Sequence, residues 1–123
     1  MQTDLRRFFD SYRDSFPSGP AAIAAFYSEP CMTARSGVVR VNATHADTAA
    51  LFAEVDRQYR ARGFTHADYL PLNSHELGAN SILATIRWTY KNFQDAPLWE
   101  TTFSYNLYKR NSEWKILVQT MHD

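Results

Sequence analysis

The sequence predicts an α+β domain in which three helices of the N-terminal half pack on a curved, mainly antiparallel sheet of about six strands. Apolar residues recur at helical spacing before Gly63, and four long runs rich in β-branched and aromatic residues follow it. Helices followed by strands are typical of a sheet with helices on one face. The chain has 123 residues without a repeat or linker, so we expect residues 1–123 to form a single domain.

Two helices are predicted before the first strands. The first ends at Pro17 and has apolar residues at the spacing i, i+3, i+4, i+7 and i+11. Pro20 is suited to the first position of a short second helix. This second helix is expected to carry Phe26 and Tyr27 on one face and to stop at Glu29-Pro30. The apolar face of the first helix comprises Leu5, Phe8, Phe9, Tyr12 and Phe16.

A small hairpin and a third helix are predicted next. Cys31–Arg35 and Val38–Val41 are short strand-like runs separated by Ser36-Gly37, which is typical of a hairpin turn. Thr44 begins a capping sequence, and Gly63 is a C-terminal stop signal. The buried stripe of this helix is predicted to be Leu51, Phe52, Val55 and Tyr59.

The second half of the chain predicts a four-stranded antiparallel meander. Turn signals occur near Gly78-Ala79-Asn80, at Gln94-Asp95-Ala96-Pro97 and at Asn111-Ser112. Pro71 lies in the first of the four strands. Because proline cannot donate to a strand ladder, that strand is expected to lie at an edge or to contain a bulge.

Side-chain alternation assigns the long strands to two faces. If the last two strands pair without interruption from Arg110 and Glu113, Thr101 faces His122. If the preceding turn pairs Tyr90 with Thr101, these three polar side chains lie together. The predicted covered face comprises Ile82, Ile86, Trp88, Tyr90, Phe103, Tyr105, Leu107, Trp114, Ile116 and Val118.

The opposite face of the predicted sheet is amphipathic. It collects threonine, serine, asparagine and tyrosine side chains together with Leu83, Leu117 and Met121. A surface of this composition is better suited to an interface than to bare solvent. We therefore expect the chain to form a homodimer through this face.

Composition excludes several classes of partner. Lys and Arg number 13 and Asp and Glu number 13, so no net field attracts nucleic acid or anionic lipid. No apolar run is long enough to span a bilayer, which takes roughly 20 residues. Cys31 is the single cysteine and cannot form an internal disulfide, so a cytoplasmic location is expected.

The chain resembles a known superfamily in four segments. These are Ala25–Pro30, Asn80–Trp88, Tyr105–Ile116 and the terminal His122-Asp123. With the order of predicted elements, they look like the nuclear transport factor 2-like superfamily and its SnoaL-like branch. The resemblance implies a cystatin-like cone. It leaves the activity open, because the superfamily includes ketosteroid isomerase, scytalone dehydratase, limonene epoxide hydrolase, polyketide cyclases and transport adaptors.

The residues do not fit a ketosteroid isomerase-like site. Tyr12 matches the oxyanion-donating tyrosine of that site by position, but Arg35 or Ser36 occupies the place of the carboxylate base. The acid on the long strand is also missing, since Tyr105 or Asn106 falls there. Without the base the proton-transfer step is lost, so isomerase activity of this type is not expected.

Three functions remain open. The first is binding of a small apolar or aromatic molecule, without a cofactor, in a pocket inside the cone. The second is a cofactor-free lyase, isomerase or cyclase with His122 as the best catalytic candidate, because histidine titrates near neutrality. The third is a homodimeric interaction module with a filled interior. The predicted pocket residues are Tyr12, Tyr27, Trp88, Tyr90, Thr101, Tyr105 and His122.

The sequence predicts neither a metal nor a nucleotide cofactor. The four histidines show no His-x-His or Glu-x-x-His spacing. A phosphate loop and a dinucleotide fingerprint are also missing from the sequence. Cys31 has no histidine close to it in the sequence, so it is interpreted as a small buried residue and not as a nucleophile.

Overall fold

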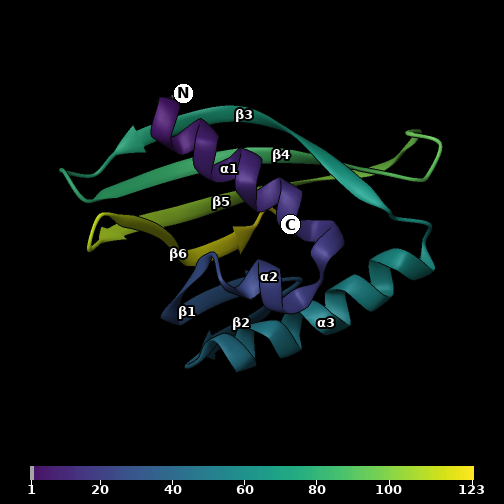
Figure 1. Cartoon of the computed structure of the whole chain (residues 1–123), viewed down its shortest axis with the longest axis horizontal. Coiled ribbons are helices and arrows are strands. Elements are labelled where there is room, and N and C mark those ends of the chain that lie inside the picture. Colours follow the sequence, from purple (N-terminus) through teal and green to yellow (C-terminus); the bar gives the residue numbers. More distant parts are fainter. Residues whose placement is uncertain (1) are drawn as a thin grey trace.

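A six-stranded mixed sheet forms the base of the molecule, and helices cover one of its faces (Figure 1). The computed structural model describes residues 2–123. The elements are α1 (Thr3–Ser15), a 3-10 turn η1 (Phe16–Ser18), α2 (Pro20–Ala24), β1 (Tyr27–Arg35), β2 (Val38–Asn42), α3 (His45–Ala61), β3 (His66–Glu76), β4 (Ser81–Lys91), β5 (Pro97–Arg110) and β6 (Glu113–Met121). The predicted α+β class, with three helices and about six strands, is confirmed.

The strand order in the sheet is β2-β1-β6-β5-β4-β3. Strands β3 to β6 form the predicted antiparallel meander, whereas β1 runs parallel to β6. The sheet is open, with β2 and β3 at its edges. Pro71 lies on the edge strand β3, where the register shifts between Pro71 and Asn73, so both expectations for this proline are met.

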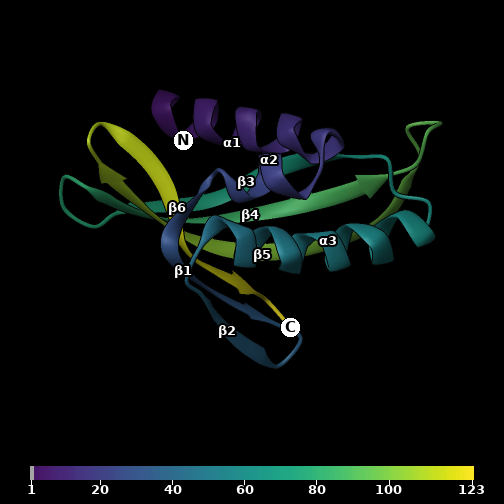
Figure 2. The same cartoon turned by 60° about the horizontal axis from the view of Figure 1, so that its bottom comes forward.

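The helices form the second layer of the cone. Helix α1 crosses the long strands, and α3 lies near β1 and β2 (Figures 1 and 2). Helix α1 buries Leu5, Phe9 and Tyr12 on the face that the apolar spacing predicts. Thr44 caps α3, since its Oγ1 accepts the Asp47 N–H at 3.2 Å. Over residues 2–123, no helix is both long and apolar enough to cross a membrane.

The second helix is shorter than predicted. It ends at Ala24, Phe26 lies in the turn that follows, and Tyr27 begins β1, so the two residues do not share a helical face. The Ile116 N–H donates to the Phe26 carbonyl at 2.8 Å, and Tyr27 pairs with Ile116 in the sheet. This pairing joins β1 to the last strand, β6. The sequence pattern around Pro20 is local and does not predict such a long-range pairing.

A β-bulge interrupts the pairing of β5 with β6. Leu107 lies opposite Ile116, as predicted, but Asn106 lies opposite Val118. Leu117 is therefore an extra residue on β6. Because side chains alternate along a strand, one extra residue exchanges the two faces for everything that follows it.

Because of this bulge, the predicted faces are wrong for the residues of β6 that follow Leu117. Tyr105 lies opposite Gln119 instead of Val118, and Gln119 is buried at 2% exposure. Met121 packs against the core, although it was predicted on the opposite face. His122 is exposed and lies on the uncovered face of the sheet, here called the outer face.

The pairing of β4 with β5 is displaced by two residues from the predicted register. Trp88 lies opposite Thr101, and Ile86 lies opposite Phe103. The connecting turn is closed by the Asn92 side chain, which accepts two backbone N–H groups. A displacement of two residues leaves every side chain on its predicted face, so the covered face of β4 and β5 was predicted correctly.

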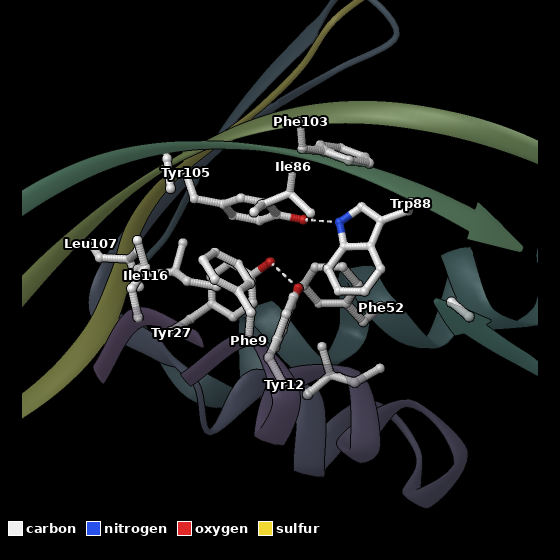
Figure 3. Close-up of a cluster of buried hydrophobic side chains, with 14 of the residues drawn as sticks. Phe9, Tyr12, Tyr27, Phe52, Ile86, Trp88, Phe103, Tyr105, Leu107 and Ile116 are labelled. Atoms are coloured by element: carbon white, nitrogen blue, oxygen red, sulfur yellow. Dashed lines mark hydrogen bonds between the residues drawn. The ribbon is translucent and has the colours of Figure 1, made fainter. Parts of the chain in front are cut away.

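The core is unusually aromatic and lies between the helices and the covered, inner face of the sheet (Figure 3). Its largest fully buried side chains are Trp88, Tyr12, Tyr27, Tyr105, Phe9 and Phe103. Three of these six carry a hydroxyl group and one carries an indole N–H, and each such group needs a hydrogen-bond partner when it is buried.

Candidate functional site

A cavity of about 50 Å³ lies between the helices and the inner face of the sheet. It is larger than the roughly 10–15 Å³ that a water needs, but smaller than the roughly 300–1,000 Å³ of a pocket for a drug-sized ligand. Arg35, Asp56 and Gln119 are its charged or amide-bearing lining residues. The rest of the wall is formed by Tyr12, Phe16, Ile23, Phe52, Val55, Tyr59, Phe64, Trp88, Tyr90, Phe103 and Tyr105.

A buried tyrosine pair lies beside the cavity. The hydroxyl oxygens of Tyr12 on α1 and Tyr27 on β1 are 2.6 Å apart, as the dashed line in Figure 3 shows. Burial is the largest cause that raises the pKa of both residues well above the ordinary tyrosine value, and it leaves both phenols neutral. Tyr12 lines the cavity, whereas Tyr27 contacts it only through the Tyr12 hydroxyl.

A second buried pair joins the two long strands. The indole Nε1–H of Trp88 donates to the Tyr105 hydroxyl at 2.8 Å (Figure 3). Burial raises the pKa of Tyr105 well above its ordinary value, since little solvent reaches the phenol to stabilise its anion. Both side chains line the cavity.

The predicted group of Tyr90, Thr101 and His122 is assembled only in part. The Tyr90 and Thr101 hydroxyls are 2.6 Å apart on the inner face. His122 is not with them, and the prediction that it lies in the cone is wrong. Its Nε2 is 2.8 Å from the Ser104 hydroxyl on the outer face, because the bulge at Leu117 has exchanged the faces of the strand end.

Four of the seven predicted pocket residues line the cavity, namely Tyr12, Trp88, Tyr90 and Tyr105. Tyr27 and Thr101 instead hydrogen-bond to lining side chains and hold them in position. The hydroxyls of these predicted residues therefore form two hydrogen-bonded pairs, Tyr12 with Tyr27 and Tyr90 with Thr101, and the phenols in them are neutral. A neutral phenol with a raised pKa can donate a hydrogen bond, but it is a poor proton acceptor near neutral pH.

Sequence reasoning missed the most polar part of the wall. Arg35, the last residue of β1, donates from Nη1 to Gln119 Oε1 at 3.0 Å and from Nη2 to the Tyr59 hydroxyl at 3.3 Å. Its guanidinium carbon lies 5.1 Å from the Phe103 ring centroid. A sequence signal existed for Arg35, because Arg35 or Ser36 falls where the resemblance to ketosteroid isomerase would place the carboxylate base. For Gln119 there was none, because only the bulge turns it inward.

The Asp56 carboxylate in the cavity wall is already engaged. Arg60 Nε lies 3.0 Å and 2.9 Å from its two oxygens. No cluster of three or more His, Cys, Asp or Glu side chains suited to a metal ion occurs within residues 2–123. The arrangement can therefore hold a molecule between aromatic walls and offer it hydrogen bonds, but its described lining residues present no unengaged carboxylate base.

Comparisons with known proteins place the fold among described relatives. A family model described as NTF2-like protein (DUF6841) matches residues 3–123. No curated protein sequence matches the chain. An NTF-2 like protein of unknown function from Shewanella oneidensis MR-1 is similar in structure, with a TM-score of 0.76 and 18% identity, covering 98% of this chain and 97% of that one.

Two further solved structures are similar over nearly the whole chain. One is a domain of unknown function with a cystatin-like fold from Nostoc punctiforme PCC 73102, with a TM-score of 0.77, 13% identity and coverage of 98% of this chain and 78% of that one. The other is Aln2 from a Streptomyces species, with a TM-score of 0.76, 10% identity and coverage of 99% and 92%. At these identities the likeness shows the fold alone.

Proposed function

The chain belongs to the NTF2-like family of the DUF6841 description, and we propose that it binds a small molecule inside its cone. The observation that carries the proposal is the composition of the cavity wall. Aromatic rings surround a space that also meets a guanidinium, a buried amide and tyrosine hydroxyls. Ligand sites in proteins combine these features: mostly apolar walls and a few fixed polar groups that orient the ligand.

The size of the cavity limits the ligand. At about 50 Å³, the space admits a molecule of a few heavy atoms as it stands. A larger ligand requires movement of the half-buried lining side chains, namely Phe16, Arg35, Val55, Asp56 and Tyr59. Four of these five belong to η1 and α3 and only Arg35 belongs to the sheet, so the helical layer is the main side on which the cavity can widen.

A substitution that fills the cavity tests the proposal. Val55→Phe on α3 places a larger side chain at the lining, and it is expected to abolish binding of small aromatic fragments that bind the wild-type chain. Binding can be followed by ligand-observed NMR and by the chemical shift of the Trp88 indole N–H. Ala53→Phe is the matched control, because Ala53 is exposed on the same helix.

Two results would contradict this proposal. One is fragment binding that leaves the Trp88 indole signal unchanged, and the other is equal binding by the Val55→Phe chain and the wild-type chain. Either result would favour the interaction module with a filled interior. The catalytic alternative loses its best candidate, because His122 lies outside the cone.

We also propose that the chain forms a homodimer through its outer sheet face. Met32 of β1 lies between Val41 of β2 and Val118 of β6, and all three belong to the outer face. Val39 and Val41 are each 68% exposed, and Met32 is 40% exposed. Val118 is half-buried. An apolar row of this kind, mostly exposed on an uncovered sheet face, supports an interface with a second copy of the chain.

Val41→Glu is expected to convert the dimer into a monomer, because a symmetric contact would bury the new carboxylate from each copy next to apolar side chains. Sedimentation velocity measures the change in mass. Arg40→Glu is the control, since Arg40 is exposed on the same strand but on its other face. A wild-type mass of one chain at high protein concentration would refute the dimer.

The cytoplasm is the proposed compartment. Cys31 is a free and buried thiol, with its Sγ 3.3 Å from the Thr48 hydroxyl. A single free cysteine held in the interior is compatible with a reducing environment and provides no disulfide framework. Fractionation of cells that express the tagged chain tests the location directly.

A further inference from the structure

Arg35 is a half-buried cation surrounded by neutral groups. Its two hydrogen bonds go to the Gln119 amide oxygen and to the Tyr59 hydroxyl, and its guanidinium lies near the rings of Phe52 and Phe103 at 5.8 Å and 5.1 Å. An arginine has five N–H donors and remains charged at every physiological pH. Donors of Arg35 therefore remain for another acceptor.

The other half-buried arginine of the chain is in a different position. In the part of the chain that the structure describes, Arg13 and Arg35 are the two arginines of intermediate exposure. Arg13 lies within ion-pair distance of Asp10 and Asp14, whereas no carboxylate of residues 2–123 lies within 4.0 Å of Arg35. A partly desolvated charge without a counterion is unfavourable by itself and is compensated when an anion binds.

An anion that accepts hydrogen bonds from Arg35 would lie in the cavity, and the neighbouring charged groups limit the charge that it can carry. Arg35 lines the same space as Asp56, whose carboxylate is neutralised by Arg60. The charge left at the site is therefore that of the Arg35 guanidinium alone. One monoanion balances this charge, whereas a dianion such as phosphate would leave an excess negative charge. A planar carboxylate also matches the fork of the guanidinium, and the Tyr59 hydroxyl can donate its own O–H to the second oxygen.

We infer that Arg35 binds the carboxylate of a small monocarboxylic acid whose short apolar body occupies the cavity between Tyr12, Val55 and Trp88. This inference rests on the proposed function and names the chemical class of its ligand. The small volume favours a ligand body of a few carbon atoms. The aromatic wall favours an apolar body, either an aliphatic chain or a hydrocarbon ring, over a polar body.

The test compares acids with their neutral amides. Acetate, butyrate and benzoate are titrated against the wild-type chain by calorimetry, together with acetamide, butyramide and benzamide. At least one acid is expected to bind about tenfold more tightly than its amide. Arg35→Met should remove this preference, since it keeps an apolar side chain but no charge. Arg35→Lys should retain part of it, because a charge remains without the planar fork.

Arg62→Met is the matched control. Arg62 is exposed at the end of α3 and stacks on Trp99 at 3.7 Å, outside the cavity wall. Its loss removes one charge near the site and should leave the preference for acids unchanged. If Arg35→Met does not fold, the comparison of acid with amide in the wild-type chain still decides the matter.

The outcomes separate the two proposals. Equal affinity for acids and amides in the wild-type chain overturns the role of Arg35 and leaves small-molecule binding intact. An acid preference that survives in Arg35→Met also overturns it. Absence of binding by every acid and amide, together with absence of binding in the aromatic-fragment experiment with Val55→Phe as the control, overturns the binding function itself.

Discussion

Replacing Trp88 with alanine is expected to lower the free energy of unfolding by about 3–5 kcal/mol, the usual cost of truncating a large buried aromatic residue. Trp88 is 1% exposed, and its ring centroid lies 5.1 Å from that of Phe16 and 5.9 Å from that of Tyr12. The substitution also leaves the buried Tyr105 hydroxyl without its indole donor. Urea unfolding followed by circular dichroism measures the loss.

Phe93→Ala is the control for this experiment. Phe93 lies in the turn between β4 and β5 and is 80% exposed, so its truncation is expected to change stability by no more than about 0.5 kcal/mol. The comparison separates the loss of burial from the loss of an aromatic ring as such. A similar effect of both substitutions would contradict the packed core described here.

Alkaline pH is expected to unfold the chain cooperatively. Burial is the main cause that raises the pKa values of Tyr12, Tyr27, Tyr90 and Tyr105 above the ordinary tyrosine value of about 10. The stabilising contribution of these neutral phenols is present below that value. Above it the phenols ionise in the unfolded chain but stay protonated in the folded one. Stability is therefore lost as the pH rises from about 10 toward the folded-state pKa values.

Tyr69 should be distinguishable from these four residues. Partial burial, followed by its hydrogen bond to Asp10, raises the pKa of Tyr69 to about 12. Tyrosinate absorbance during an alkaline titration counts the phenols that ionise, and near-UV circular dichroism reports the folded packing in the same samples. The four buried phenols are expected to ionise only when the circular dichroism signal is lost.

A titration in concentrated urea is the control, because all seven tyrosines of the unfolded chain should then ionise in a single transition near the ordinary value. Complete ionisation of the native chain with its near-UV signal intact would contradict the burial of these phenols. The Tyr12–Tyr27 and Trp88–Tyr105 hydrogen bonds would then not describe the protein at high pH.

The sequence by itself determined the local elements and most of the core. Leu5, Phe9 and Tyr12 lie on the predicted helical face, Thr44 caps α3, and Pro71 lies at an edge with a register shift. These features depend on spacing, capping and turn chemistry within a few residues. The inner face of β4 and β5 was also predicted correctly, because an error of two residues in register does not change the face.

Only the tertiary structure decided which residues line the cone. The parallel pairing of β1 with β6 joins segments from opposite ends of the chain, and it places Arg35 of β1 beside Gln119. The bulge at Leu117 turns Gln119 inward and His122 outward, reversing the prediction for both. A bulge leaves no composition signal, and long-range strand pairing is set by the packing of distant segments. For these reasons the sequence identified the aromatic wall, and the fold supplied its charged group.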